Sequence, residues 1–448
     1  MAHQAEFDEK YDLMINLPVE KLVCRMAIPS IVTMMISAMY NMADTYFVGS
    51  LGTSATAGVG IVFSLMALIQ AIGFFFGHGA GNYVSRRLGA QDLARASKMA
   101  ATGFFSSLAF GVLLAAAGLM NLDSLARFLG ATETIMPFAR DYLKFILVGS
   151  PWVATSLMMN NLLRFQGSAF YGMIGMASGA VINIVLDPVL IFGLGMGVAG
   201  ASLATMISQF AAFCLLFRGC AKKGNVRIRL RNFSLLPYYY REIVRGGAPS
   251  LIRQGIAAVA VVCLNRLAGA YGDAAIAAIS IVQRVVMFAN AALIGFGQGF
   301  QPVCGFNYGA KRYDRVKRAF WFCVKVSTAW LLLMSLAGIV FAPGVIAIFR
   351  GDDAEVISIG VLSLRLNCAA FPLMGWVIMN NMMLQTIGKA IPASVLALSR
   401  QGLFLLPALF ALTPMFGLLG LQSSQLVADV ATFILAVPLG LTALREMK

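Results

Sequence analysis

Residues 170–192 read FYGMIGMASGAVINIVLDPVLIF, and the one charged side chain in this run is Asp187. The run is long enough to cross a bilayer, which takes about 20 apolar residues as a helix. Similar runs recur along the whole chain, which is 59% hydrophobic and 12% charged, with a mean hydropathy of +0.81. A soluble domain carries about twice that share of charge. The sequence therefore predicts an all-α membrane protein.

Apolar length predicts about twelve membrane-spanning helices. The polar start of the chain lacks a cleavable signal, so we expect the first apolar run to stay in the membrane. The expected spans are 23–48, 55–78, 99–120, 138–160, 170–192, 197–217, 243–268, 275–299, 318–342, 357–383, 393–412 and 417–442.

Basic residues gather in the connections that follow even-numbered spans. They include Arg86, Arg87, Arg95, Lys98, Lys222, Lys223, Arg227, Arg229, Arg231, Lys311, Arg312, Arg315, Lys317 and Arg318. The positive-inside rule then places these connections and both termini in the cytoplasm, with the protein in a bacterial inner membrane. This topology accounts for the net charge of +15, so a nucleic-acid partner is not expected.

The chain also repeats itself at an offset of 220 residues. The offset pairs Met159-Asn160-Asn161 with Met379-Asn380-Asn381, and it pairs Gly89-Ala90 with Gly309-Ala310. Each half has an even number of spans, so the sequence predicts two parallel six-helix repeats around a central cavity. We expect an N-lobe at 1–217, a cytoplasmic interlobe linker at 218–242 and a C-lobe at 243–448.

Two acids lie inside spans of the N-terminal half, Asp44 in the first and Asp187 in the fifth. Ionisable groups in lipid are costly and mark functional sites by default. Asn183 lies one helical turn before Asp187, and Asn160 and Thr205 add an amide and a hydroxyl. Oxygen ligands of this kind suit Na⁺, with Asp44, Asn183 and Asp187 as its ligands, and paired carboxylates equally suit a proton. The alternative is that both acids only bond to neighbouring backbone or polar groups.

The C-terminal half carries cations within its spans, together with one deep acid, Asp429. We expect Asp429 to form an ion pair with Arg400 or Arg253, because a lone acid in lipid is either paired or protonated. Pro29 and Pro249 occupy equivalent positions of the two repeats, where proline permits a kink; a hinge is predicted at Pro29.

Motifs of an enzyme or an ATPase do not occur in the sequence: it has no Walker motif and no nucleophile triad. An ion gradient, Na⁺ or H⁺, is therefore the expected energy source. We expect no other cofactor.

Three stretches resemble the multidrug and toxic compound extrusion (MATE) family, in its DinF-like or MepA-like branch. They are Tyr40-Asn41-Met42-Ala43-Asp44-Thr45, then Asn183-Ile184-Val185-Leu186-Asp187-Pro188, and Gly297-Gln298-Gly299-Phe300-Gln301-Pro302. The resemblance implies antiport of small amphipathic, often cationic molecules against Na⁺ or H⁺ by alternating access. It also implies an N-lobe cation site at the residues named above, and a bend of the first span at Pro29.

One departure concerns the C-lobe. The NorM-like branch places acids in the seventh and tenth spans, whereas the seventh span here offers Arg253 and Gln254. Because of this departure, we do not expect a NorM-type cation site in this lobe. A lipid or lipid-linked sugar flippase of the same superfamily is the main alternative, since an anionic head group would suit the C-lobe arginines. A channel is a further alternative. The expected partners are small-molecule substrates and the lipid bilayer, with the protein as a monomer.

Overall fold

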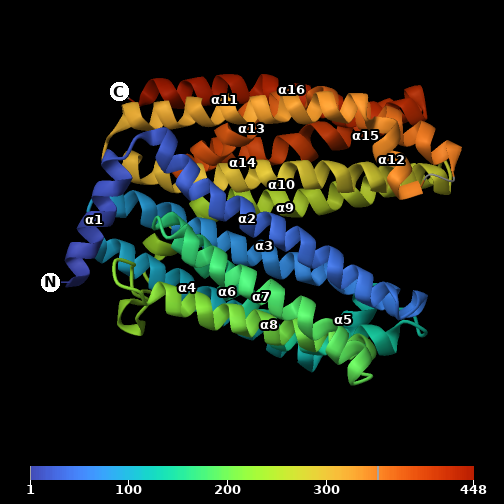
Figure 1. Cartoon of the computed structure of the whole chain (residues 1–448), viewed down its shortest axis with the longest axis horizontal. Helices are drawn as coiled ribbons and strands as arrows, with labels where there is room; N and C mark the ends of the chain where they lie inside the picture. The colour runs from blue at the N-terminus through green and yellow to red at the C-terminus, as the bar shows by residue number, and fades with distance from the viewer. Residues whose placement is uncertain (1, 351–352, 448) are drawn as a thin grey trace. The chain divides into compact units, whose positions relative to one another are not determined.

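The computed structural model describes residues 2–350 and 353–447. The described part of the chain is helical and has no β-strand (Figure 1). Twelve of its helices are long and apolar enough to cross a membrane. The predicted class, an all-α protein with about twelve spans, is confirmed.

The first half of the chain contains α1 (Ala2–Asn16), α2 (Val19–Gly49), α3 (Thr53–Gly89), α4 (Leu93–Met120), α5 (Leu122–Phe128), α6 (Met136–Phe165), α7 (Ala169–Pro188), the π-helical segment η1 (Val189–Gly193), α8 (Gly197–Cys220) and the 3₁₀ segment η2 (Leu230–Asn232). The second half contains α9 (Pro237–Gly269), α10 (Asp273–Gly309), α11 (Tyr313–Val340), α12 (Ala342–Arg350), α13 (Ala354–Thr386), α14 (Ala390–Leu398), the π-helical segment η3 (Ser399–Leu405), α15 (Leu406–Phe416) and α16 (Leu418–Glu446).

Most spans are longer than their apolar runs. The second span was expected at 55–78, but α3 continues to Gly89 through Arg86 and Arg87. Backbone hydrogen bonds do not stop where the lipid ends, and basic residues are favourable in a last helical turn. Apolar length therefore locates a span but not its ends.

The chain forms two compact units. Unit 1 contains the chain up to Leu17, Ile28–Gly247 and Gly305–Ala310; unit 2 contains Pro18–Ala27, Ala248–Cys304 and the chain from Lys311 onward. The predicted linker at 218–242 lies within unit 1. Two of the boundaries fall one residue before the repeat-equivalent prolines Pro29 and Pro249.

Within unit 1, two glycines at equivalent repeat positions pack reciprocally. A Cβ atom on Gly89 would overlap the carbonyl oxygen of Phe306, and one on Gly309 would overlap the carbonyl oxygen of Arg86. Arg86 and Phe306 are themselves 220 residues apart. Both glycines are thus required for close approach of the two backbones.

An apolar core in unit 1 packs residues of α2, α3, α6 and α8. Its fully buried members include Val62, Tyr142, Leu143 and Leu147. Tyr142 extends from this core to the polar side chains described next.

Candidate functional site

Four of the predicted site residues form a buried cluster in unit 1: Asp44 on α2, Asn183 and Asp187 on α7, and Thr205 on α8. Asn183 and Asp187 are both 0% exposed. Because they are one turn apart on α7, their side chains lie on the same face of the helix. Asn183 Nδ2 lies 3.4 Å from Asp187 Oδ1 and 3.4 Å from Thr205 Oγ1.

The Asn183 amide has a better orientation, reached by exchanging its oxygen and nitrogen. Nδ2 then donates to Asp187 Oδ2 at 3.0 Å, and Oδ1 accepts from the backbone N–H of Thr205 at 3.2 Å. Each group then meets a complementary partner, which is how such amides are assigned. Asn183 therefore connects the Asp187 carboxylate to the backbone of α8.

Asp44 supplies the second carboxylate and interacts electrostatically with Asp187. Its side chain is 3% exposed, and its Oδ1 atom has no hydrogen-bond partner among the described residues. A buried carboxylate oxygen without a partner is costly, so it calls for a proton or a cation. In the described residues no group of three or more His, Cys, Asp and Glu side chains forms a metal site. The set of two carboxylates with amide and hydroxyl oxygens instead suits a monovalent cation or a proton.

Two tyrosines complete this cluster, and sequence reasoning missed both. Tyr40 of α2 and Tyr142 of α6 both lie close enough to interact electrostatically with Asp44 and Asp187. Tyr40 lies four residues before Asp44, so the helical period could have revealed it. Tyr142 stands in an ordinary apolar span and offers no local signal.

Asp187 also lies where α7 changes its geometry. The helix ends at Pro188 and continues as the π-helical segment η1. Proline lacks the N–H that would continue the ladder, and π-helical turns are rare and occur often at functional sites. Nothing in the sequence pattern predicted this segment.

Asn160 does not join the cluster. Its Oδ1 atom lies 2.5 Å from the position that a Cβ on Gly172 would occupy. Gly172 precedes Asn183 by eleven residues on α7, or about 16 Å of helix rise.

Pro29 is also distant from the cluster, in the first half of α2, where Thr33 Oγ1 donates to its carbonyl oxygen at 2.8 Å. A hydroxyl that bonds back to the preceding turn often accompanies a bend.

In unit 2, Arg400 reaches Asp429: Nε lies 2.8 Å from Oδ1 and Nη2 lies 3.3 Å from Oδ2. Gln425 Nε2 also donates to Asp429 Oδ1, at 2.7 Å. Arg253 takes no part in this pair, because its Nη1 donates to Asn381 Oδ1 at 3.3 Å instead.

A duplicated bundle of spans with carboxylates buried inside one repeat is typical of secondary transporters. The family model MatE matches residues 29–189 and 249–410, one stretch in each half of the chain, and the chain belongs to this family of membrane transporters.

The chain is 28% identical to the multidrug export protein MepA of Staphylococcus haemolyticus, over 93% of this chain and 92% of that protein. Its fold is similar to a crystal structure of MATE in complex with MaL6, with a TM-score of 0.92, 26% identity and 98% of both chains covered. It is also similar to an outward-facing multidrug resistance MATE transporter of the MOP superfamily, with a TM-score of 0.91 and 26% identity over 97% and 98% of the two chains.

Proposed function

We propose that this protein exports small amphipathic molecules, many of them cationic, in exchange for Na⁺ or H⁺. The observation that carries the proposal is the Asp44 carboxylate, which is buried beside Asp187 and has one oxygen without a partner among the described residues. Two carboxylates held close in a low dielectric repel each other, so at least one takes up a proton or a cation. The likeness to multidrug export proteins supports the substrate class.

Coupling requires two packings that differ in their affinity for the ion and for the substrate. Pro29 supports such a change, because it is the second residue after the boundary at which α2 passes from unit 2 to unit 1. Ion binding at Asp44 would favour one packing of α2, and the helix would bend at Pro29. This is alternating access driven from the N-lobe.

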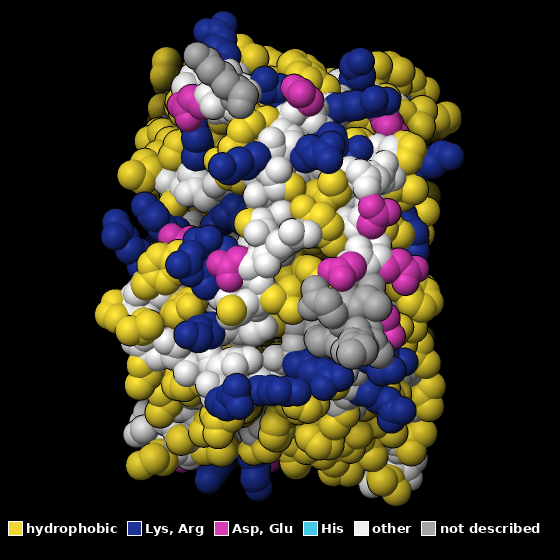
Figure 2. Space-filling view, turned by 90° about the vertical axis from the view of Figure 1, so that its left-hand side faces the viewer, with side chains coloured by type: hydrophobic (Ala, Val, Ile, Leu, Met, Phe, Trp, Pro, Cys, Tyr) yellow, Lys and Arg dark blue, Asp and Glu magenta, His cyan; other side chains and the backbone are white. Residues whose placement is uncertain are grey.

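The proposed location is a bacterial inner membrane, with both termini in the cytoplasm. The face drawn in Figure 2 carries many Lys and Arg side chains, as expected of a cytoplasmic surface. Exposed basic residues of the connections include Arg95, Lys222, Lys223, Arg229 and Lys311.

Dye efflux from proteoliposomes tests this function. Ethidium efflux should follow an imposed Na⁺ or pH gradient, saturate with dye concentration and stop when the gradient is collapsed. An efflux rate that does not change with either gradient would contradict the antiport mechanism. Non-saturating flux would instead indicate a channel. The flippase alternative is not favoured, because MepA is a multidrug export protein and the similar solved structure is a multidrug resistance transporter.

A further inference from the structure

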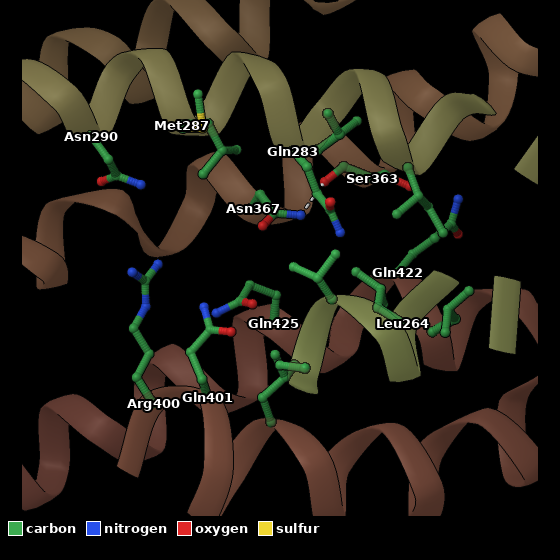
Figure 3. Close-up of a pocket in the computed structure, with 17 residues that line it drawn as sticks. Leu264, Gln283, Met287, Asn290, Ser363, Asn367, Arg400, Gln401, Gln422 and Gln425 are labelled. Atoms are coloured by element: carbon green, nitrogen blue, oxygen red, sulfur yellow. Dashed lines mark hydrogen bonds between the residues drawn. The ribbon is translucent and has the colours of Figure 1, made fainter. Parts of the chain in front are cut away.

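Unit 2 contains a cavity of about 310 Å³ that the N-lobe cluster does not touch. Its walls come from α9, α10, α13, the π-helical segment η3 and α16 (Figure 3). One guanidinium, Arg400, and several glutamine and asparagine side chains line it together with apolar residues. The cavity is therefore polar on part of its surface and apolar on the rest, as small-molecule sites are.

Arg400 borders this cavity, and some of its N–H donors are not used in the ion pair with Asp429. A guanidinium carries five N–H donors, and Asp429 accepts from two of them. Within the described residues no protein group accepts from the other three. The Arg400 side chain is 21% exposed, whereas Asp429 is 1% exposed. The ion pair thus fixes the guanidinium from its buried side and leaves its remaining N–H groups on the cavity side.

Amide side chains surround the same space. Figure 3 shows Asn290 and Gln283 on one wall, carried by α10, and Arg400 and Gln401 on the opposite wall. Asn290, Gln283 and Gln401 are partly exposed, and the described residues form no hydrogen bond with their side chains. Partly buried amides that the protein leaves unsatisfied are available to a ligand.

The local backbone supports a binding role. Arg400 and Gln401 are neighbours in sequence, and both line the cavity. They stand on the π-helical segment Ser399–Leu405. Such segments are rare inside helices and are often functional. Their placement here is a second observation, independent of the cavity.

We propose that this cavity is a second ligand site, which binds the carboxylate end of an amphipathic molecule. The planar guanidinium of Arg400 matches a carboxylate geometrically, and the amides of Asn290 and Gln401 add donors for the same oxygens. Leu264 and Val286 line the apolar part, against which the rest of the molecule packs. A cationic group would instead be repelled by the guanidinium. The lining residues that the structure describes include no acid, and Asp429 beside the cavity already accepts from Arg400 and Gln425.

This site extends the proposed exporter function to a second substrate class, but binding itself needs no ion gradient. The test uses the full-length protein in lipid nanodiscs and two fluorescent probes that differ only in charge, dansylglycine and dansylglycinamide. The parent protein should bind dansylglycine at least about tenfold more tightly, as expected for a charge-assisted hydrogen-bonding group.

Arg400→Gln alone would leave Asp429 unpaired, so the decisive variant is Arg400→Gln/Asp429→Asn, which keeps the pair neutral. It should lose the preference for dansylglycine. A second variant on the opposite wall, Asn290→Leu, should weaken dansylglycine binding severalfold. Arg365→Gln, an exposed arginine of α13 that does not line the cavity, is the matched control and should keep the preference.

Equal affinity for both probes in the parent, or a preference that survives in the double variant, would overturn the site. Ethidium efflux in proteoliposomes separates the two proposals. If the parent protein prefers dansylglycine but shows no gradient-driven efflux, only the exporter mechanism is wrong. If efflux is normal but the parent binds both probes equally, only the second site is wrong.

Discussion

Arg400 donates two hydrogen bonds to Asp429, from Nε to Oδ1 at 2.8 Å and from Nη2 to Oδ2 at 3.3 Å. The carboxylate is 1% exposed, so this is a buried ion pair within the membrane-spanning part of unit 2. Burying both charges costs much of what their attraction returns. The pair therefore has more influence on local geometry than on net stability.

Removing only one partner of the pair should nonetheless lower the stability strongly. Asp429→Ala leaves the partly buried Arg400 guanidinium without its acid partner, and we expect a loss of about 3 kcal/mol in unfolding free energy, the lower end of the range for buried pairs. The double variant Arg400→Gln/Asp429→Asn should lose clearly less. Thermal unfolding in detergent measures both. Asp123→Ala breaks the exposed pair with Arg140 and serves as the control, with an expected loss below about 1 kcal/mol. If Asp429→Ala behaves like this control, the pair is not structurally important.

Gly89 should not tolerate even one methyl group. Gly89→Ala places a Cβ onto the carbonyl oxygen of Phe306, and overpacking of this kind costs roughly 1–3 kcal/mol. Gly60→Ala is the matched control in the same helix, because nothing lies within 4 Å of the added atom. The melting temperature should fall for Gly89→Ala and stay level or rise for Gly60→Ala. Equal melting temperatures would mean that the two backbones do not approach as described.

The buried side chain of Lys10 should make the stability of the folded protein depend on pH. Its Nζ donates to Ser168 Oγ and to Asn225 Oδ1, each at 2.6 Å, and burial lowers the pKa of this lysine from 10.5 to about 7. Between these values the unfolded chain binds the proton and the folded chain does not. Stability contributed by this group therefore rises with pH across that window.

The comparison is between the parent and Lys10→Met, which cannot titrate at this position. The melting temperature of the parent relative to Lys10→Met should rise between about pH 7 and pH 10. Lys223→Met, in the exposed part of the linker, gives the baseline for losing a positive charge. A difference that does not rise beyond this baseline would show that Lys10 stays charged in the folded protein.

The orientation can be tested by cysteine labelling, after the exposed Cys24 and Cys214 are replaced by serine. Asp353 caps α13 by accepting from the backbone N–H groups of Glu355 and Val356, so the outer cysteine is better placed at the exposed Glu355. An impermeant maleimide should label Arg229→Cys only from the cytoplasmic side and Glu355→Cys only from outside. Labelling of both from one side would contradict the topology.

Sequence reasoning reached the spans because lipid imposes a simple rule on length and polarity. It missed α5 and α12, which are too short to stand out from their loops. It also missed the π-helical segments that contain Val189 and Arg400, because their register depends on tertiary packing. Asp44 and Asp187 were found because charge in an apolar run is conspicuous. Tyr142 was not found, because its proximity to Asp44 and Asp187 arises only when the helices pack together.

The N-lobe acids are the most direct test of coupling. Asp44→Asn and Asp187→Asn are nearly isosteric and should leave expression and folding intact. Each removes the negative charge that binds the coupling ion, so each should abolish gradient-driven ethidium efflux. Asn183→Ala removes the amide between Asp187 and Thr205 and should weaken efflux, more strongly for a Na⁺ gradient than for a pH gradient, because Na⁺ needs the amide oxygen as a ligand. Asn160→Ala is the control for losing an amide elsewhere in the same unit and should leave the ratio of the two efflux rates unchanged. If both Asp→Asn variants pump at the parental rate under the same gradient, the coupling ion binds elsewhere, and the arginine-containing unit 2 is then the place to search.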